Sequence, residues 1–286
     1  MMRNCHRLRR IKFFVNAVIS LIPSFIFGQT VLLDDFNRAN STLLGNGWNE
    51  TETVAGTGVQ LSNNQVVCGS TTAGRDYCWR DVSSQYNTVY STNNGPLTWM
   101  FNMRQSRTNP SGFDPGYYGI AFVLGSNTSN FISGSNGYAV VLGNSGTGDN
   151  LRLVRFTNGI AANANLITAI APIDSFNTQY LTVKVTFNPV GNLWSLFVDS
   201  NTTSFSNPST ATYRQLGSTV ADNTYTSTDL LYLGCLWNHS TASSDNAYFD
   251  NIYIPTACIL AAEPTVQSTG LTATTTGANS IQLSWT

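Results

Sequence analysis

Charged side chains are scarce in this sequence. Only 10% of its 286 residues are Asp, Glu, Lys or Arg, whereas aromatic residues make up 12%. Typical soluble domains are about 25% charged. A disordered chain is rich in charge and poor in aromatic residues, and a helical bundle needs Glu, Lys, Arg, Ala and Leu on its faces. Both classes are therefore excluded, and the abundance of Val, Ile, Thr, Tyr, Phe and Trp favours an all-β chain.

The sequence also lacks an apolar run of the length that spans a membrane. Its longest one, residues 13–28, is broken by Pro23 and is shorter than the roughly 20 residues that a membrane helix needs. Five basic residues and no acidic one precede it, namely Arg3, Arg7, Arg9, Arg10 and Lys12. This pattern is typical of a secretory signal peptide. We expect cleavage after Gly28 and a secreted or cell-surface protein, and an uncleaved signal anchor is the alternative.

Basic residues are few once residues 1–28 are set aside. The remainder has nine basic and 15 acidic residues, a net charge of −6, and Lys184 as its sole lysine. A basic surface is the first requirement for nucleic-acid binding. The composition therefore excludes nucleic acid as a partner and gives no attraction to anionic lipid.

Cysteines are few as well. Cys5 lies in the predicted signal peptide, and four others remain, namely Cys68, Cys78, Cys235 and Cys258. An even number in an exported chain favours disulfides, and we expect the pairs Cys68–Cys78 and Cys235–Cys258. Free thiols are the alternative. Zinc is disfavoured because no CxxC pair is present and one histidine, His239, remains.

Short strand-like segments with turn residues between them fill the chain from residue 31 to 254. Residues 180–188 alternate apolar and polar side chains, which is the pattern of a half-buried strand. A turn at Pro189–Asn192 joins them to residues 193–199, which indicates an antiparallel hairpin. The other expected strands are residues 31–36, 58–62, 65–68, 76–82, 97–104, 118–124, 138–143, 150–156, 230–237 and 248–254. This density of short strands predicts a β-sandwich or barrel with almost no helix.

Four segments give the chain a family resemblance. They are LLDDFNRANSTLLGNGW, GYAVVLG with NLRLVRFTNG, LTVKVTFNPVGNLWSLFVD, and YFDNIYI. Over Thr30–Pro255 the sequence resembles the concanavalin A-like lectin/glucanase superfamily, and within it the laminin-G-like domains of secreted bacterial proteins. The resemblance implies a two-sheet antiparallel jelly roll with its first and last strands side by side. This fold hosts lectins, hydrolases, lyases and adhesion modules, so it leaves the function open.

The composition changes after the last expected strand. Residues 256–264 include Pro264 and are expected to form a linker. Residues 265–286 resemble the start of a fibronectin type III domain, with Trp285 as its core tryptophan. A lone hairpin is marginal in water, so we expect a fragment of a larger modular protein with further domains after it.

Residues for hydrolysis are sparse. The Glu-x-Asp-x-x-Glu pattern of the best-known glycosidases of this fold is absent. Glu50 and Glu52 would lie about 7 Å apart on a strand, but solvated carboxylates are the simpler interpretation. A Ser–His–Asp triad would have to use His239 as its base, and His239 lies in a loop-like stretch without a GxSxG motif. We therefore expect no enzyme, with a glycan-cleaving hydrolase as the alternative.

Acidic and amide residues at both ends of the sandwich predict a structural calcium site, because calcium prefers oxygen ligands. The candidate ligands are Asp34, Asp35, Asp250 and Asn251. Strand alternation places Asp250 on the face of Ile252 and Ile254, where a carboxylate needs a partner. Arg38 or backbone amides could fill that role instead. A weaker candidate is the 144–150 loop, with Asn144, Asp149 and Asn150, and an ordinary turn is the alternative there.

Aromatic residues predict carbohydrate binding, since sugars stack on aromatic faces. The candidates are Trp79, Trp99, Tyr117, Tyr118 and Trp237. Packing in the core or at its rim is the alternative for each. We therefore predict a non-catalytic secreted or surface module that binds glycan or another extracellular ligand within an adhesin-like protein. A ligand-free structural spacer is a further alternative.

Overall fold

The computed structural model describes residues 30–69, 72–108, 110, 113, 119–143, 148–168, 176–239, 246–256, 272–277 and 280–284. The predicted signal peptide, most of the linker, Tyr117, Tyr118, Asn144, Cys258 and Trp285 lie outside this set. Within it, the structure is all β, with a single 3-10 turn at Tyr90–Thr92. No helix of the described part is long and apolar enough to cross a membrane.

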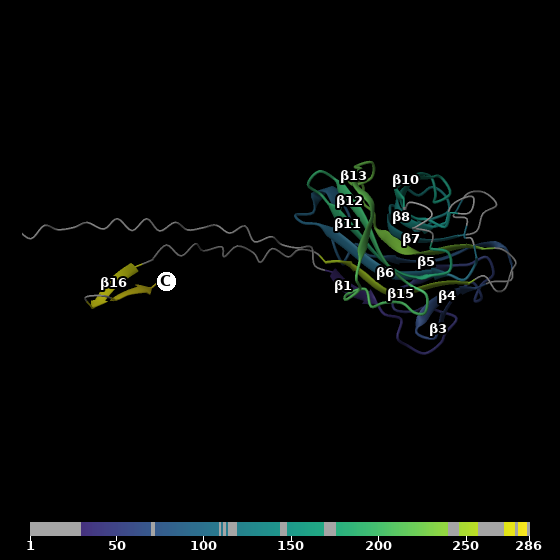
Figure 1. Cartoon of the computed structure of the whole chain (residues 1–286), viewed down its shortest axis with the longest axis horizontal. Coiled ribbons are helices and arrows are strands. Elements are labelled where there is room, and N and C mark those ends of the chain that lie inside the picture. Colours follow the sequence, from purple (N-terminus) through teal and green to yellow (C-terminus); the bar gives the residue numbers. More distant parts are fainter. Residues whose placement is uncertain are drawn as a thin grey trace, which may run out of the picture.

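Two antiparallel sheets form the predicted β-sandwich (Figure 1). The eight-stranded sheet has the order β13-β12-β11-β6-β15-β4-β3, and β1 pairs with β15. Its strands are β1 (Thr30–Asp34), β3 (Val59–Ser62), β4 (Gln65–Gly69), β6 (Leu97–Gln105), β11 (Tyr180–Asn188), β12 (Leu193–Asn201), β13 (Arg214–Ala221) and β15 (Asn246–Pro255). In Figure 1 their labels descend from β13 to β3.

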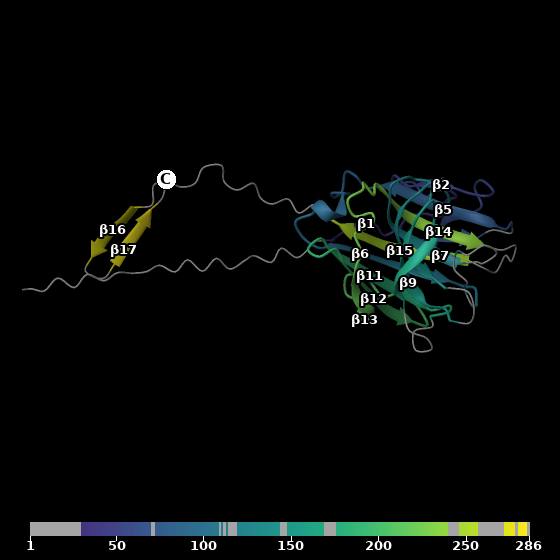
Figure 2. The same ribbon diagram turned by 90° about the horizontal axis from the view of Figure 1, so that it is seen from above.

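The facing sheet has seven strands in the order β10-β9-β8-β7-β14-β5-β2 (Figure 2). They are β2 (Asn49–Thr51), β5 (Gly74–Asp81), β7 (Gly119–Ser126), β8 (Gly137–Leu142), β9 (Leu151–Phe156), β10 (Asn163–Thr168) and β14 (Tyr232–His239). A separate two-stranded sheet, β16 (Thr272–Gly277) and β17 (Ser280–Ser284), follows. No finding identifies that hairpin with a fibronectin domain, so this resemblance stays a prediction.

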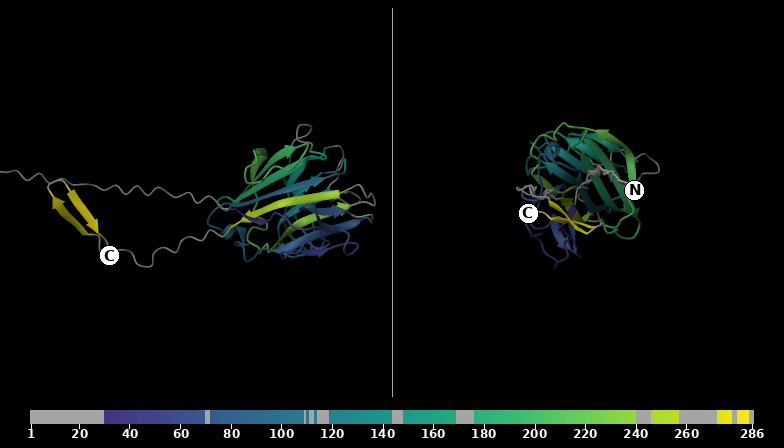
Figure 3. Two further views of the ribbon diagram at one scale, coloured as in Figure 1. Left: turned by 90° about the horizontal axis from the view of Figure 1, so that it is seen from below. Right: turned by 90° about the vertical axis from the view of Figure 1, so that its left-hand side faces the viewer.

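The first and last strands of the sandwich pair, as the resemblance implied. Thr30 is opposite Pro255 and Asp34 is opposite Ile252, with a register shift between Leu32 and Asp34. Figure 3 shows the two sheets from further sides. The pairing fixes the chain's first strand against the C-terminal half of β15, and it places Asp34 beside the last strand.

The main core lies between the sheets and is rich in aromatic side chains. Trp99 of β6 and Trp194 of β12 are fully buried and stack with ring centroids 6.2 Å apart. Phe101 and Phe122, from facing sheets, stack at 3.8 Å. This burial of large apolar surface is the dominant stabilising contribution to the fold.

A second apolar cluster covers the outer face of the seven-stranded sheet. Phe131, in the β7–β8 connection, is fully buried there and lies 5.4 Å from the Tyr77 ring. A Cβ on Gly234 would come within 2.8 Å of the Phe131 ring. Strands β7, β8 and β14 are consequently buried on both faces, whereas the β2–β5 edge stays partly open.

Candidate functional site

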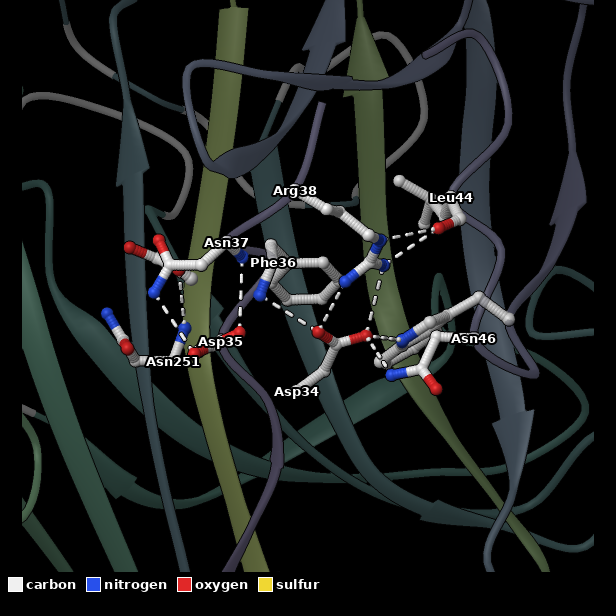
Figure 4. A network of polar contacts seen from close by, with 10 residues as sticks. Asp34, Asp35, Phe36, Asn37, Arg38, Leu44, Asn46 and Asn251 are labelled. Atoms are coloured by element: carbon white, nitrogen blue, oxygen red, sulfur yellow. Dashed lines mark hydrogen bonds and ion pairs between the residues drawn. The ribbon is translucent and has the colours of Figure 1, made fainter. Parts of the chain in front are cut away.

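Asp34 is the centre of a buried hydrogen-bond network where the first and last strands meet (Figure 4). The residue is 4% exposed. The Arg38 guanidinium donates to both carboxylate oxygens, at 2.7 and 3.1 Å. The other donors are the Phe36 amide at 2.8 Å, Asn46 Nδ2 at 3.0 Å and Trp48 Nε1 at 2.9 Å. These donors together occupy both oxygens of the carboxylate.

The same network sets the charge of Asp34. Burial acts to raise the pKa of Asp34, but the hydrogen bonds from Arg38, the Phe36 amide, Asn46 and Trp48 outweigh it and hold the pKa below its usual value. Arg38 also donates to the Leu44 carbonyl, at 3.1 and 2.7 Å. The ion pair therefore anchors the loop after β1 as well as the strand itself.

Asp250 is placed differently from the prediction. Asn251 has a positive φ of 47° and lies at a register shift of β15. This bulge puts Asp250 opposite Asn102, on the outer face of the sheet, while Ile252 packs in the core. The predicted shared face of Asp250 and Ile252 is wrong, because an extra residue in a bulged strand reverses the alternation that follows it.

Within the described part of the chain, Asp250 accepts a single hydrogen bond, from the Asn251 amide at 2.8 Å. Burial, together with the nearby charges of Asp35 and Asp34, raises the pKa of Asp250 to about 7, against the effect of that amide. Asp35 accepts two hydrogen bonds from Asn37, at 3.1 and 3.0 Å. Asp250 is therefore a carboxyl group that is partly protonated near neutral pH.

The donors around Asp34 do not fit a calcium ligand, since its oxygens already face a guanidinium, two side-chain N–H groups and an amide. Arg38, which the sequence offered as a partner for Asp250, pairs with Asp34 instead. No group of three or more His, Cys, Asp or Glu side chains in the described part of the chain is placed to hold a metal ion. Calcium wants six to eight oxygens, so the predicted set has too few ligands here.

The weaker calcium candidate is described only in part. Asp149 is 4% exposed, and burial raises its pKa to about 6. Asn150 is also buried, at 7% exposed. Asn144 lies outside the described residues, so the set of three stays a prediction.

Glu50 and Glu52, the candidate residues for a hydrolase, accept hydrogen bonds from backbone amides. Glu50 accepts the Leu44 amide at 2.5 Å, and burial raises the pKa of Glu50 although this bond opposes it. Glu52 accepts the amides of Gly58 and Val59 at 2.8 and 2.6 Å, and that of Gly56. Both carboxylates organise loops at the β2 edge, which is a structural use of the pair.

His239 lies on a strand, contrary to the predicted loop. It ends β14 and is 1% exposed. Its Nε2 lies 2.9 Å from Oδ2 of Asp76, and both side chains are fully buried. Trp237 stacks on the imidazole at 4.0 Å, and the Thr53 amide donates to Asp76 at 2.5 Å. A pair this inaccessible to solvent joins β5, β14 and the loop after β2 rather than facing a substrate.

The cysteines that the structure describes are free thiols. Cys68, Cys78 and Cys235 are each fully buried, and none of them is in a disulfide. The predicted Cys68–Cys78 disulfide is wrong, since both thiols are free. Cys68 comes from β4 of one sheet, whereas Cys78 of β5 in the other sheet lies opposite Cys235 of β14. Burial raises the pKa of Cys68 and Cys235 well above the usual range. The predicted Cys235–Cys258 disulfide is wrong as well, because Cys235 is free; Cys258 itself lies outside the described residues.

Two of the predicted sugar-binding tryptophans belong to the core. Trp99 and Trp237 are both fully buried between the sheets. Trp99 Nε1 donates to the Tyr86 hydroxyl at 3.4 Å. Neither ring presents a face to solvent. Tyr117 and Tyr118 lie outside the described residues, and their role stays a prediction.

Trp79 is the predicted aromatic residue that remains partly exposed. It lies on the outer face of β5, edge-to-face with Tyr232 of β14, with ring centroids 5.4 Å apart. Asn49 of β2 is opposite Trp79, and Asp81 is opposite Tyr232. Asn49 and Asp81 are exposed. We call these four residues the Trp79 patch.

The eight-stranded sheet also has a hollow that no sequence pattern predicted. It has a volume of about 370 Å³ on the outer face of this sheet. It is lined by Pro96, Thr98, Thr186, Asn188, Leu193, Ser195 and Thr219. The alternation of residues 181–187 had placed Thr186 on the outer face, but sequence alone could not identify the neighbouring strands.

Several solved structures have a similar fold, and plant lectins are among them. Lectin II from Ulex europaeus is 12% identical and aligns over 74% of this chain and 93% of its own, with a TM-score of 0.50. Winged bean acidic lectin, complexed with methyl-α-D-galactose, is 11% identical over 79% and 97%, with a TM-score of 0.50. The VIP36 exoplasmic/lumenal domain, in a Ca²⁺/Man2-bound form, is 10% identical over 80% and 88%, with a TM-score of 0.50.

These likenesses establish a legume-lectin-like, concanavalin A-like β-sandwich as the fold of residues in the two large sheets. No family model matches the sequence, and no curated protein does. The finer laminin-G-like resemblance stays a prediction. At such low identity the ligands of the lectins do not transfer to this chain.

Proposed function

We propose that this protein is a non-catalytic carbohydrate-binding module. The observation that carries the proposal is the Trp79 patch, in which two aromatic rings and two polar side chains share one outer face. Sugar C–H faces pack on aromatic rings, and amide and carboxylate groups accept or donate hydrogen bonds to hydroxyls. The lectin fold of the chain supports the same assignment.

The patch has the exposure that a binding surface needs. Trp79 is fixed by its edge-to-face contact with Tyr232, which limits the entropy lost on binding. Asp81 Oδ1 accepts the Ser83 amide at 2.8 Å, which orients the carboxylate. Its second oxygen is therefore held in a defined direction on an exposed side chain.

The acidic residues support a binding role over hydrolysis. Glycosidases need two carboxylates flanking the scissile bond, whereas Glu50 and Glu52 are bonded to loop amides. Export, attachment to further domains and an adhesin-like context belong to the same proposal. They rest on the signal-like N-terminus and on the change of composition after residue 255.

A panel of oligosaccharides tests the proposal on the whole chain without residues 1–28. We expect micromolar to millimolar binding to at least one neutral sugar and no release of reducing ends. Trp79→Ala should weaken binding at least tenfold. Phe205→Ala, which removes a half-buried ring that packs on Tyr180, is the matched control and should bind normally. No binding to any sugar would favour a structural spacer, and reducing ends lost in Glu50→Gln or Glu52→Gln would favour a hydrolase.

A further inference from the structure

The hollow on the eight-stranded sheet is built from one row of hydroxyl side chains. Thr98 is opposite Thr186 in the β6–β11 pair, and Thr186 is opposite Ser195 in the β11–β12 pair. Ser195 Oγ and Thr219 Oγ1 are 2.7 Å apart, which extends the row to β13. Neighbouring strands are about 4.8 Å apart, so the row offers a hydroxyl at each regular step across four strands.

The lining has no charged side chain. Besides the hydroxyls it contains the Asn188 amide and the apolar side chains of Pro96 and Leu193. Leu193 is 38% exposed at the edge of the hollow. Hydroxyl and amide groups beside exposed carbon suit a ligand that alternates hydroxyls with C–H surface.

Lys184 lies on the same outer face as the hollow, two residues before Thr186 on β11. Its Nζ is 4.5 Å from the ring centroids of both Phe197 and Tyr213. Burial lowers the pKa of Lys184. A cation held between two rings is satisfied by them, and the lining of the hollow, as far as the described residues form it, has no charge with which to select an anion.

We propose that this hollow is a second carbohydrate subsite, which takes a neutral, linear oligosaccharide lying across strands β6, β11, β12 and β13. The inference rests on the proposed function and extends it. The Trp79 patch lies on the outer face of the other sheet, so the two sites face away from each other. The module is then bivalent, and it can join two glycan chains.

The size of the hollow agrees with this ligand class. Its volume of about 370 Å³ lies at the lower end of the roughly 300–1,000 Å³ of small-molecule sites. The row of hydroxyls is longer than one sugar ring, since it crosses four strands. A linear chain can place successive hydroxyls along this row, whereas a single monosaccharide would use only part of it.

The test combines two sets of variants. Thr186→Val with Ser195→Ala removes two hydroxyls at nearly constant volume, and Thr186→Tyr fills the hollow. Thr210→Val, at an exposed loop position, is the matched control. Calorimetry uses hexaoses of β-linked glucose, xylose, mannose and N-acetylglucosamine. Light scattering with the corresponding soluble polysaccharides reports cross-linking.

We expect two hexaose sites per wild-type chain and one in either Trp79→Ala or the hollow variants. The wild type should cross-link the polysaccharide, and each single-site variant should bind without cross-linking. One site that is lost in Trp79→Ala and unchanged in the hollow variants would overturn the second subsite alone. No binding by the wild type would overturn the proposed function. A change of oligomeric state in the hollow variants, with sugar binding intact, would assign the hollow to a second copy of the chain and overturn the inference.

Discussion

Arg38 donates hydrogen bonds from both terminal nitrogens to the two carboxylate oxygens of Asp34, at 2.7 and 3.1 Å. The side chain of Asp34 is 2% exposed and that of Arg38 is 29% exposed. A bidentate pair of this kind is directional as well as charged. It joins the first strand to the loop after it at the point where the last strand closes the sheet.

Replacing Arg38 with Ala should destabilise the fold by about 3 kcal/mol, because it leaves a buried carboxylate without its cation. Arg38→Lys keeps the charge but loses the planar fork, so it should cost less. Urea unfolding of the three proteins measures the difference. Equal unfolding midpoints would show that the pair contributes nothing to stability.

Asp250 should make the protein less stable as pH rises. Its pKa is about 7 in the folded protein, above the ordinary value of 3.8. Between about pH 4 and 7 the folded state therefore keeps a proton that the unfolded chain has already lost. The stabilisation is present below pH 4 and is lost as pH rises through 7. Asp250→Asn should remove this loss and be more stable than wild type at pH 8 by about 1–2 kcal/mol, less than full burial would give.

Thermal unfolding from pH 4 to 8 tests this expectation for both proteins. Asp34, Asp76 and Asp222, whose pKa values are lowered, act in the opposite direction at low pH and are common to both. The difference between the two curves therefore isolates Asp250. Parallel curves would contradict the raised pKa.

Calcium should leave the melting temperature unchanged, because Arg38 and the other donors occupy Asp34. The measurement compares wild type in calcium and in chelator at pH 8, where Asp250 is ionised. Asp250→Asn is the matched control. A rise in melting temperature with calcium that disappears in this variant would restore the predicted metal site.

His239→Leu should destabilise the fold by about 3–5 kcal/mol, because it leaves the fully buried Asp76 carboxylate without its partner. His239→Gln can still donate a hydrogen bond and should cost less. Chemical unfolding at pH 7 compares them. If Leu were tolerated better than Gln, the carboxylate would not need a donor at this position.

The three buried cysteines should react with a thiol reagent only after unfolding, since burial keeps Cys68 and Cys235 protonated and the thiolate is the reactive form. Alkylation in denaturant followed by mass spectrometry should find Cys68, Cys78 and Cys235 modified. A peptide linked through Cys68 and Cys78 would contradict the free thiols.

The sequence patterns predicted the strands well where apolar and polar residues alternate. Each of the twelve expected strands lies within two residues of an observed one. The missed strands β2, β10 and β13 are polar and lie at sheet edges. In β13, Gly217 has a positive φ of 58° beside a register shift, so its side chains give no clean two-residue period.

The residues of the proposed site were harder to predict, because exposure depends on what covers each face of a sheet. The strand that contains Trp237 is buried on both faces, so its composition does not show which face of the sheet Trp237 lies on. Trp79 and Trp99 look alike in sequence, yet Trp79 packs against the outer apolar cluster and stays partly exposed, while Trp99 is fully buried in the core between the sheets. Likewise, the bulge at Asn251 reverses the direction of Asp250, which local alternation could not show.

Sugar binding by Trp79→Ala beside wild type is the most direct measurement of the central claim. Wild type should bind at least one neutral oligosaccharide in calorimetry, and Trp79→Ala should bind it at least tenfold more weakly while unfolding at a similar temperature. Equal affinity in the two proteins, or no affinity in wild type for any sugar of the panel, would contradict carbohydrate recognition by this face.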